Sequence, residues 1–325
     1  MKKILIIQTA FIGDVILATP VISELKRVHP DFVVDVLVRK GNESLLANNP
    51  GINEVLILDK KQKKTKEILR LIQIIRAKKY NEIINLHRYL SSGLLTIFGN
   101  SKSTVGFISN PISFLYTKKI KHSLSNRQHE VDRNLNCIAH YNVEKRVRPS
   151  LFPSELENET TKKYKHETYF CLTPASVWFT KQLPIHKWIE LISKLERFGT
   201  VYLLGGNLDY KLCEKIIKES KTTKAINLAG KLSFLESASL MKDAKRNFVN
   251  DSGPLHICSA MNASVTAFFC STITAFGFGP LSDDSKVLEV ENLKCRPCGI
   301  HGHKKCPKGD FKCGNDIILT IENLN

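Results

Sequence analysis

One stretch of the sequence, residues 250–256, combines residue types that could hold an anionic group. It reads Asn250-Asp251-Ser252-Gly253-Pro254-Leu255-His256 and follows the apolar pair Phe248-Val249. This order predicts a strand, a tight Ser-Gly turn and a helix with proline in its first turn. Such a junction points backbone N–H groups and the positive end of a helix dipole at whatever lies above it, which suits a nucleotide diphosphate. A capped helix start with a surface histidine explains the same residues, so the stretch alone leaves both interpretations open.

A second candidate is the loop from Thr9 to Asp14, which follows the apolar run Ile4 to Ile7. Asp14 stands at the start of a predicted helix that runs to about Val28. A carboxylate there could face a cleft as a general base, or it could simply cap the helix. The loop has one glycine, Gly13, and does not match the dinucleotide fingerprint G-x-G-x-x-G, which argues against an NAD-dependent enzyme.

The second half of the chain offers two more polar loops, each after a predicted strand. The first contains Ser176 and Lys181, and a lysine there could neutralise charge that develops on a phosphate. The second runs from Gly205 to Asp209. Its glycines allow close backbone approach, and Asp209 could accept hydrogen bonds from ribose hydroxyls. Each loop is weak evidence by itself, but four of them along the edge of one sheet point to one site.

The elements that must position these loops follow a regular alternation. Apolar, β-branched runs alternate with amphipathic segments, which predicts parallel sheets with right-handed helical crossovers. The pattern lapses at 144–167, where prolines and charges predict an interdomain linker. We therefore predict an α/β protein with two Rossmann-like domains, residues 1–150 and 151–325, and a site at the carboxyl ends of the strands in their shared cleft. The predicted strands are 4–7, 32–38, 55–58, 82–86, 169–172, 201–204, 225–228, 248–249 and 265–269.

Composition narrows the class of protein. With 325 residues and 42% hydrophobic content, the chain is long enough for two globular domains. The first residues faintly resemble a signal peptide, but Gln8 and Asp14 interrupt the apolar run and no small-residue cleavage site follows. No run is long enough to cross a bilayer. We therefore expect a cytoplasmic protein that begins with a buried strand.

The net charge of +17 favours nucleic acid, an anionic membrane surface or phosphorylated substrates as partners. Each basic cluster is also compatible with solvated surface lysines. None is interleaved with the aromatic residues expected of a protein that binds single-stranded nucleic acid. The clusters are Lys60 to Lys66, Lys118 to Lys121, and Lys304, Lys305 and Lys308.

With these loops in place, the chain resembles the heptosyltransferase family, glycosyltransferase family 9. The matching stretches occur in the family's order and spacing over nearly the whole chain: Gly13-Asp14-Val15 with Thr19-Pro20, Lys181 with Pro184 and Trp188, Asn227-Leu228-Ala229-Gly230, and residues 250–256. The resemblance implies the GT-B fold, with an N-terminal acceptor-binding domain and a C-terminal nucleotide-sugar-binding domain. It also implies an inverting, metal-independent transfer of a sugar, typically from ADP-heptose, to a lipopolysaccharide core, with no cofactor required.

The resemblance also implies a role for each site residue. Asp14 is the base that deprotonates the acceptor hydroxyl, and Lys181 steadies the departing diphosphate. No D-x-D signature occurs, which agrees with metal-free catalysis because a helix dipole and a lysine can replace the cation. The implied donor-binding residues are Ser176, Asp209, Asp251, Ser252, Gly253 and His256.

Four residues are implied on the acceptor side: Arg88, Ser92, His129 and Arg133. The two arginines suit a carboxylate or phosphate on the acceptor, although Arg133 could equally be an exposed helical charge that pairs with Glu130 or a neighbouring acid. The sequence departs from the family after the last predicted strand. Cys270-Ser271-Thr272 stands where many members carry Gly-Pro-Thr, a change expected to alter the donor sugar pocket.

Nine cysteines in a cytoplasmic chain suggest thiols or metal ligands rather than a disulfide framework. Four of them, Cys295, Cys298, Cys306 and Cys313, could form a structural tetrathiolate zinc site, with His301 and His303 as alternative ligands. Reduced thiols and disulfides are the alternatives. None of these options gives the cysteines a part in transfer.

The expected partners are a nucleotide-sugar donor and an anionic glycolipid acceptor, without nucleic acid. The expected location is the cytoplasmic face of the inner membrane, where the positive charge would meet anionic lipid. Three alternatives stay open: a transferase of the same fold with another nucleotide sugar, a catalytically idle family member, and a basic nucleic-acid-binding protein. The last explains the charge but not the converging polar loops.

Overall fold

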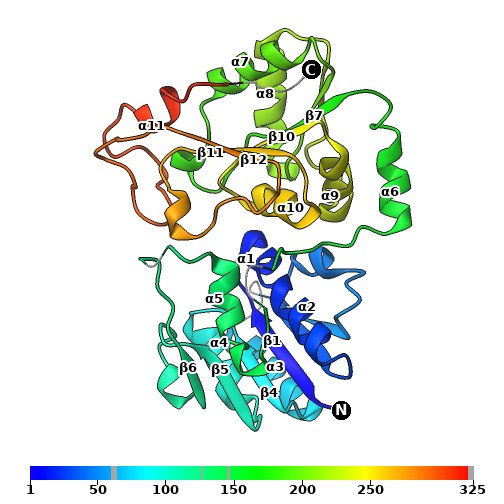
Figure 1. Ribbon diagram of the computed structural model, residues 1–325, viewed down its shortest axis with the longest axis vertical. Coiled ribbons are helices and arrows are strands. Elements are labelled where there is room, and N and C mark those ends of the chain that lie inside the picture. Colours follow the sequence, from blue (N-terminus) through cyan, green and yellow to red (C-terminus); the bar gives the residue numbers. More distant parts are fainter. Residues whose placement is uncertain (60–63, 126, 145–146, 321–325) are drawn as a thin grey trace. The chain divides into compact units, whose positions relative to one another are not determined.

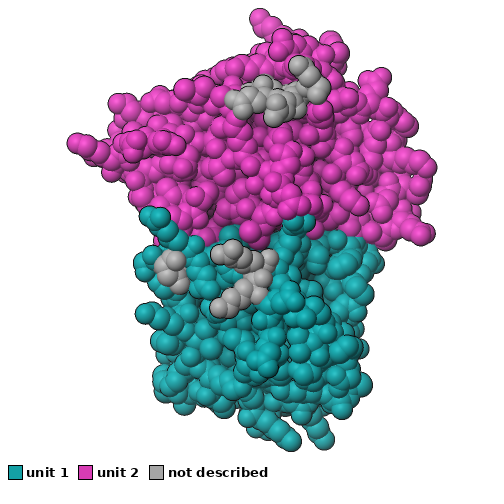
Figure 2. Space-filling model, in the orientation of Figure 1, with its two compact units in different colours: residues 1–152 teal, residues 153–325 magenta. Residues whose placement is uncertain are grey.

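Two six-stranded sheets, one from each half of the chain, form the framework of the protein. In the computed structural model they lie in two compact units, residues 1–152 and 153–325, shown in Figures 1 and 2. The structure describes residues 1–59, 64–125, 127–144 and 147–320, so part of the basic cluster at Lys60 to Lys66 lies outside the described residues. The unit boundary falls two residues after the predicted domain boundary. The assignment of acceptor and donor binding to the two halves stays a prediction.

In unit 1 the sheet order is β3-β2-β1-β4-β5-β6, and every pair is parallel. Ile4 to Ile7 of β1 are all completely buried, which requires cover on both faces of the strand. On one face, Leu5 and Ile7 share an apolar cluster with Leu71 and Ile75 of α3. The strands are β1 (Lys3–Gln8), β2 (Val33–Arg39), β3 (Glu54–Leu58), β4 (Glu82–Asn85), β5 (Ser103–Phe107) and β6 (Lys118–Ile120). The helices are α1 (Ile12–Ile16), α2 (Thr19–Val28), α3 (Lys64–Lys78), α4 (Leu90–Phe98) and α5 (Glu130–Asn136), with short turns η1 (Glu43–Leu46), η2 (Ser113–Leu115) and η3 (Ala139–Tyr141).

In unit 2 the sheet order is β12-β11-β10-β7-β8-β9, again with every pair parallel. Its core is aromatic, and the Trp188 ring meets the Phe268 ring edge-on at 5.3 Å. The strands are β7 (Tyr169–Thr173), β8 (Thr200–Leu203), β9 (Ala225–Asn227), β10 (Arg246–Asn250), β11 (Val265–Phe269) and β12 (Ser285–Glu289). The helices are α6 (Glu155–Lys162), α7 (Ile185–Leu195), α8 (Tyr210–Ser220), α9 (Phe234–Asp243), α10 (Gly253–Met261) and α11 (Lys312–Asn315), with turns η4 (Phe179–Lys181), η5 (Asn207–Asp209) and η6 (Thr274–Phe276).

Both sheets therefore have the doubly wound strand order 3-2-1-4-5-6 when each is numbered from its own first strand. In this order the chain reverses direction across the sheet between β1 and β4 in unit 1, and between β7 and β10 in unit 2. Ligands of such sheets bind beyond the carboxyl ends of the strands at the reversal point. The loops that follow these four strands are therefore the places to look for a site.

The predicted α/β class is confirmed, but several predicted elements were wrong. The helix predicted from Asp14 to Val28 is two helices, because Pro20 has no N–H to continue a helix and instead lies in the first turn of α2. The predicted linker contains α6, which Ser154 and Glu157 cap reciprocally. The Thr161 hydroxyl of α6 forms a hydrogen bond with the Ser239 hydroxyl of α9, with 2.9 Å between the oxygens, so α6 packs against the rest of unit 2.

Three strands were not predicted, namely β5, β6 and β12. In β5 the glycine hides the strand pattern, yet Gly106 is needed. A Cβ there would lie 2.6 Å from the Tyr116 ring and 2.9 Å from the Asn85 carbonyl oxygen. The edge strand β6 is largely exposed and begins with two lysines, so it lacks an apolar run.

Among the described residues, the longest helix is α3, with 15 residues. None of the described helices combines the length and the apolar character that crossing a membrane requires.

Candidate active site

Asp14 lies in the first turn of α1, at the carboxyl end of β1 (Figure 1). Its Oδ2 atom accepts a hydrogen bond from the Phe11 backbone N–H at 3.1 Å. The carboxylate therefore caps the helix, which was the simpler of the two interpretations of Asp14. Capping also fixes the position of the side chain at the sheet edge, so the two interpretations are compatible.

The electrostatics of Asp14 are those of a proton acceptor. Burial raises the pKa of Asp14 to about 6, and the nearby carboxylate of Glu130 adds to this effect. The Phe11 N–H and the Arg88 guanidinium oppose it. A carboxyl group with such a pKa is ionised at neutral pH and more basic than an ordinary aspartate, as general-base catalysis requires.

The loop after β4 lies beside the loop after β1. The Thr9 hydroxyl and the His87 Nδ1 atom are 2.8 Å apart and both side chains are buried, so they join the two loops at the reversal point. Arg88 follows directly and is only partly buried. No hydrogen bond or ion pair links it to another of the described residues. Its charge is therefore available to an anionic group near Asp14.

Ser92, predicted to contact the acceptor, is completely buried. Its hydroxyl lies 3.0 Å from the His87 carbonyl oxygen and 2.8 Å from that of Tyr89, and it accepts a bond from Asn85. These bonds stabilise the turn that starts α4. Ser92 therefore supports the Arg88 loop from inside and presents no surface to an acceptor.

Arg133 is also buried, so the exposed side chain of the alternative prediction was wrong, although the predicted pair with Glu130 is present. Its Nε atom donates to Glu130 Oε2 at 2.6 Å, and its Nη1 atom donates to the Ser123 and Gln128 carbonyls. The His122 Nε2 atom contacts the same carboxylate at 3.1 Å. Burial raises the pKa of Glu130, but His122 and Arg133 outweigh it and hold that pKa below its ordinary value. The cluster therefore maintains a fixed negative charge near Asp14.

His129, the fourth predicted acceptor residue, is the N-cap of α5. Its Nδ1 atom accepts a hydrogen bond from the Val131 N–H at 3.2 Å. The side chain is partly exposed, so contact with an acceptor stays a prediction.

In unit 2 the central feature is an ion pair between Lys181 and Asp251. Lys181 Nζ lies 2.7 Å from Asp251 Oδ2, and both side chains are largely buried. The same oxygen accepts a hydrogen bond from the Thr272 hydroxyl at 2.6 Å. The pair joins the loop after β7 to the loop after β10, on either side of the reversal point. Sequence reasoning placed Lys181 and Asp251 at one site, and the structure brings them together.

Asn250 holds the Lys181 loop against β10. Its Oδ1 atom accepts from the Leu183 N–H at 2.8 Å, and its Nδ2 atom donates to the Pro174 carbonyl at 2.9 Å and the Thr173 carbonyl at 3.3 Å. The side chain is completely buried. This clamp fixes both ends of the segment that carries Ser176 and Lys181.

The predicted helix start is confirmed as α10, with Ser252 as its N-cap and Pro254 in the first turn. Asp251 of the ion pair lies two residues before the first residue of this helix, so the backbone N–H groups of the first turn follow it closely in the chain. His256 is buried within the same helix, and its ring meets that of Phe278 edge-on at 6.5 Å. Gly253 is the first residue of the helix. The predicted anion site therefore has its helix N-terminus, a cation and a carboxylate.

The two other predicted donor residues lie in neighbouring loops. Ser176 is partly exposed, and its carbonyl accepts a bond from the Gln182 amide at 2.6 Å. Asp209 accepts from the Gly206 N–H at 2.8 Å and so shapes the glycine turn after β8. A Cβ on Gly205 would lie 2.8 Å from the Asp209 Cβ, which explains the glycine. Contact of Ser176 with phosphate and of Asp209 with ribose stays a prediction.

A segment near the C-terminus packs on the Lys181 loop. The Thr180 N–H donates to the His303 carbonyl at 3.1 Å, and the His303 N–H donates to the Thr180 hydroxyl at 2.7 Å. Arg296 donates to the Thr272 carbonyl, from Nε at 3.0 Å and from Nη2 at 2.6 Å. The segment therefore supports two residues of the ion-pair network, Lys181 through its neighbour and Thr272 directly.

The four C-terminal cysteines lie in and after this segment as free thiols. Burial raises the pKa of Cys313 to about 12, and the thiols of Cys298, Cys306 and Cys295 add to the effect. Cys298 Sγ donates to the Cys295 carbonyl at 3.0 Å. Within the described part of the chain, no three His, Cys, Asp or Glu side chains are grouped so that they could hold a metal ion. The described residues therefore do not assemble the predicted tetrathiolate site.

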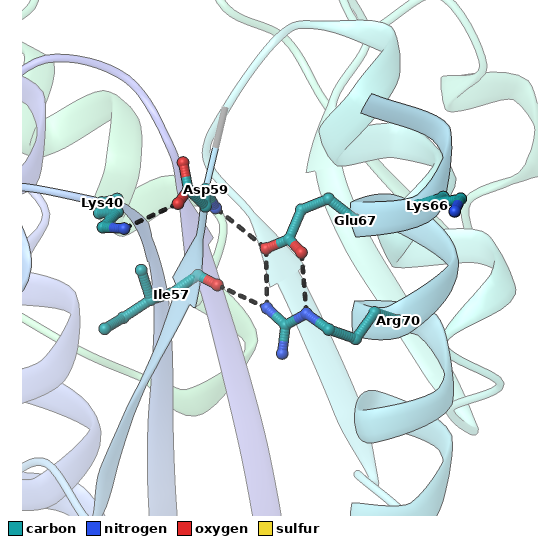
Figure 3. A pocket seen from close by; sticks show the side chains of 6 residues that line it. All are labelled: Lys40, Ile57, Asp59, Lys66, Glu67 and Arg70. Carbon is teal, nitrogen blue, oxygen red and sulfur yellow. Dashed lines mark hydrogen bonds and ion pairs between the residues drawn. The ribbon is translucent and has the colours of Figure 1, made fainter. Parts of the chain in front are cut away.

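A separate hollow of about 610 Å³ lies at the carboxyl ends of β2 and β3 (Figure 3). Lys40 pairs with Asp59 at 2.8 Å, and Arg70 pairs with Glu67 at 2.7 Å. Figure 3 shows the Lys66 side chain apart from these pairs. No predicted site residue lines this hollow, and its charges largely satisfy one another. We therefore assign no chemistry to it.

Sequence reasoning missed three residues that hold the site together: Thr272, Arg296 and the Asn250 clamp. Asn250 stood in the motif without a role. Thr272 carried a usable signal, because it keeps the threonine of the family's Gly-Pro-Thr pattern. The altered Cys270 of that pattern belongs to the buried core of unit 2.

Comparisons with known proteins identify the family and the fold of the chain. The model of glycosyltransferase family 9 (heptosyltransferase) matches residues 68–308. The chain is 28% identical over 277 residues to lipopolysaccharide heptosyltransferase 3 of Escherichia coli, a match that covers 81% of this chain and 82% of the relative.

Two solved structures have similar folds. A glycosyl transferase family 9 protein from Veillonella parvula superposes with a TM-score of 0.80 at 21% identity, covering 89% of this chain and 86% of that one. The ADP-heptose lipopolysaccharide heptosyltransferase II of E. coli gives a TM-score of 0.78 at 21% identity, covering 97% and 98%.

Proposed function

Because this chain belongs to glycosyltransferase family 9 and is a glycosyltransferase of the GT-B fold, we propose that it transfers heptose from ADP-heptose to a lipopolysaccharide core or a related glycolipid. Unit 2 binds the donor and unit 1 binds the acceptor. Curated relatives named as lipopolysaccharide heptosyltransferases support the sugar and the acceptor class. The similar E. coli structure is that of an ADP-heptose lipopolysaccharide heptosyltransferase, which supports the nucleotide.

The observation that carries the proposal is the Lys181–Asp251 pair at the start of α10. A diphosphate bound there meets a lysine cation and the positive end of a nine-residue helix. Asp251, once Lys181 turns to the phosphates, is free to accept hydrogen bonds from sugar hydroxyls. Ser176, Ser252, Gly253 and His256 border the same position, and Asp209 approaches the ribose.

We infer the reaction from the chemistry of one base in unit 1 and one anion site in unit 2. Asp14 takes the proton of the acceptor hydroxyl as the oxygen attacks the anomeric carbon of the donor. The bond from that carbon to the phosphate oxygen breaks, and its electron pair leaves with ADP. Lys181 and the α10 N–H groups offset the charge that develops on the leaving diphosphate. A single displacement of this kind inverts the anomeric centre and needs no metal ion.

The acceptor is proposed to be anionic. Arg88 forms no ion pair with another of the described residues, and its charge lowers the pKa of the nearby Asp14. A phosphate or carboxylate on the acceptor can bind this guanidinium and bring a neighbouring hydroxyl to the base. We place the reaction at the cytoplasmic face of the inner membrane, where such a glycolipid is presented.

A thermal-shift screen followed by a transfer assay tests the proposal. ADP-heptose is expected to raise the melting temperature more than UDP- or GDP-sugars, because a ligand stabilises the folded state in proportion to the logarithm of its affinity. Lys181→Ala is expected to lose most of this shift, whereas the matched surface variant Lys215→Ala keeps it. Transfer to a core glycolipid is expected to persist in EDTA. A larger shift with UDP-sugars would overturn the proposed donor, and loss of transfer in EDTA would overturn the metal-independent mechanism.

A further inference from the structure

Unit 1 exposes a group of large apolar side chains in the loops after β4 and β5. Tyr89 is 67% exposed, Leu90 48%, Ile108 54%, Phe114 69% and Leu115 52%. We call these five residues the apolar rim. Single exposed apolar residues are common on any protein, but a gathered group of aromatic and aliphatic side chains marks an interaction surface.

Hydrogen bonds join the two loops of the apolar rim into one surface. The Asn110 amide donates to the Tyr89 carbonyl at 2.9 Å and to the His87 carbonyl at 3.3 Å. The Ser113 hydroxyl donates to the Ile108 carbonyl at 2.8 Å. A Cβ on Gly93 of α4 would lie 2.4 Å from Asn110 Oδ1, so the start of α4 packs directly on the loop that carries the other three rim residues.

The charged residues of the segment that carries the apolar rim all have one sign. Residues 83–129 contain no aspartate or glutamate, although the chain has 31 acidic residues in all. The same 47 residues contain six cations: Arg88, Lys102, Lys118, Lys119, Lys121 and Arg127. Lys118, Lys119 and Lys121 are exposed, on or directly after β6, and no ion pair joins them to the described residues. The Ile108 N–H donates to the Ile120 carbonyl at 2.9 Å, so the end of β6, with Lys121 directly after it, lies next to the loop that carries Ile108.

We propose that the apolar rim inserts into the interface of an anionic phospholipid bilayer, with Lys118, Lys119 and Lys121 on the lipid headgroups. Aromatic and aliphatic side chains next to lysines are the composition of interfacial membrane anchors, and an acid-free surface avoids repulsion from anionic headgroups. Neither signal is large alone, and stable attachment generally combines both. Tyr89 directly follows Arg88, so the bilayer surface and the proposed acceptor contact are adjacent. The proposal rests on the proposed function in one respect, because that function places the protein next to a membrane.

Vesicle sedimentation in the absence of donor and acceptor tests the proposal. The wild-type protein is expected to bind vesicles of phosphatidylethanolamine with phosphatidylglycerol, to bind pure phosphatidylcholine weakly, and to be released by salt. Phe114→Ala combined with Leu115→Ala is expected to lower the partition coefficient about tenfold or more, because two large apolar side chains no longer leave water. Lys118→Glu combined with Lys119→Glu is expected to remove the preference for phosphatidylglycerol. Leu156→Ala, at an equally exposed leucine of α6 in unit 2, is the matched control and is expected to bind as wild type.

Several results would overturn the proposal. One is unchanged vesicle binding by the Phe114/Leu115 variant. Another is that the wild-type protein binds vesicles only when they contain the acceptor glycolipid, which would make the apolar rim a contact for the acyl chains of the acceptor. A lipid-free change of oligomeric state in the same variant would make it an interface between copies. The melting temperature and the ADP-heptose thermal shift of each variant show that unit 2 is intact. Failure of the proposed donor leaves the vesicle result unaffected, so the two proposals fail separately.

Discussion

Lys181 and Asp251 form an ion pair of 2.7 Å through Asp251 Oδ2, the same oxygen that accepts the Thr272 hydroxyl at 2.6 Å. The lysine is therefore held in place before any ligand arrives. A diphosphate bound as proposed would have to compete with Asp251 for Lys181, and Thr272 would remain to satisfy the carboxylate when the lysine moves away. This second bond matters because an uncompensated buried charge is costly.

Thr272→Val is expected to weaken donor binding. The variant keeps the shape of the side chain but leaves Asp251 Oδ2 with Lys181 alone, which makes the lysine harder to withdraw. We expect the KM for the donor to rise about tenfold, as for loss of one hydrogen bond to a charged group, with a smaller effect on kcat. Steady-state kinetics measure the split. Thr223→Val, at an exposed loop position, is the control, and an equal fall in kcat and kcat/KM would instead assign Thr272 to the transition state.

The pKa of Asp14, raised by burial and by Glu130 to about 6, predicts the pH dependence of transfer. The base must be ionised, so kcat/KM is expected to fall tenfold per pH unit below about 6 and to be level above it. Asp14→Asn is expected to lower kcat by about two to four orders of magnitude, as for loss of a general base, with the ADP-heptose thermal shift retained. Full turnover in the variant would remove Asp14 from the mechanism.

The raised pKa of Asp14 also affects the free energy of unfolding. A carboxyl group whose folded-state pKa lies above its unfolded value binds more protons in the folded state. The contribution of Asp14 to the free energy of unfolding therefore becomes less favourable as pH rises from about 4 to about 6, and stays so above that. Asp14→Asn is expected to melt above the wild type at pH 8, with the difference vanishing near pH 4. Calorimetry over this range measures it.

Glu130→Gln is expected to change both the pKa of Asp14 and the free energy of unfolding. Removal of the neighbouring charge lowers the pKa of Asp14, so the acidic limb of the pH profile moves to lower pH. The change also leaves Arg133 buried without its carboxylate, which costs about 3–5 kcal/mol in comparable buried pairs. The double change Glu130→Gln with Arg133→Met is expected to cost less than the sum of the single changes. Additive costs would show that the pair is not coupled.

Gly302→Ala tests the support of the Lys181 loop by the C-terminal segment. A Cβ at Gly302 would lie 2.9 Å from the Thr180 hydroxyl and 3.1 Å from Lys181 Cγ. Gly309→Ala is a matched control, because Gly302 and Gly309 have φ values of 77° and 82° but Gly309 has open space around it. Both variants carry the same backbone strain, so a loss of donor binding specific to Gly302→Ala measures displacement of Lys181. Equal kinetics in the two variants would show that the loop does not depend on this contact.

The sequence pattern was a good guide to the parts of the site that lie at strand ends. Apolar runs located β1, β7 and β10, and a polar residue after a parallel strand must lie at the carboxyl edge of the sheet. Asp14, Lys181 and Asp251 were found in this way. Thr272 could not be given its role, because its bond to Asp251 depends on the register of β11 against β10, which no local pattern encodes.

The burial of polar side chains was the second feature that the sequence could not predict. Ser92 and Arg133 are residue types that usually lie at the surface, and helical spacing gave no reason to bury them. Their burial depends on partners that come from other segments, such as the Ser123 carbonyl for Arg133 and the Asn85 amide for Ser92. Such networks appear only when the chain has folded.

The bonds between Thr180 and His303 set an order of events during synthesis. The two residues are 123 positions apart in the chain, so at typical translation rates the ribosome needs on the order of ten seconds to reach His303 after Thr180. During that interval the Lys181 loop lacks its backbone partner His303. The nascent chain therefore cannot complete the proposed donor site until nearly all of unit 2 has been made, and this half of the protein is the one expected to need chaperone protection.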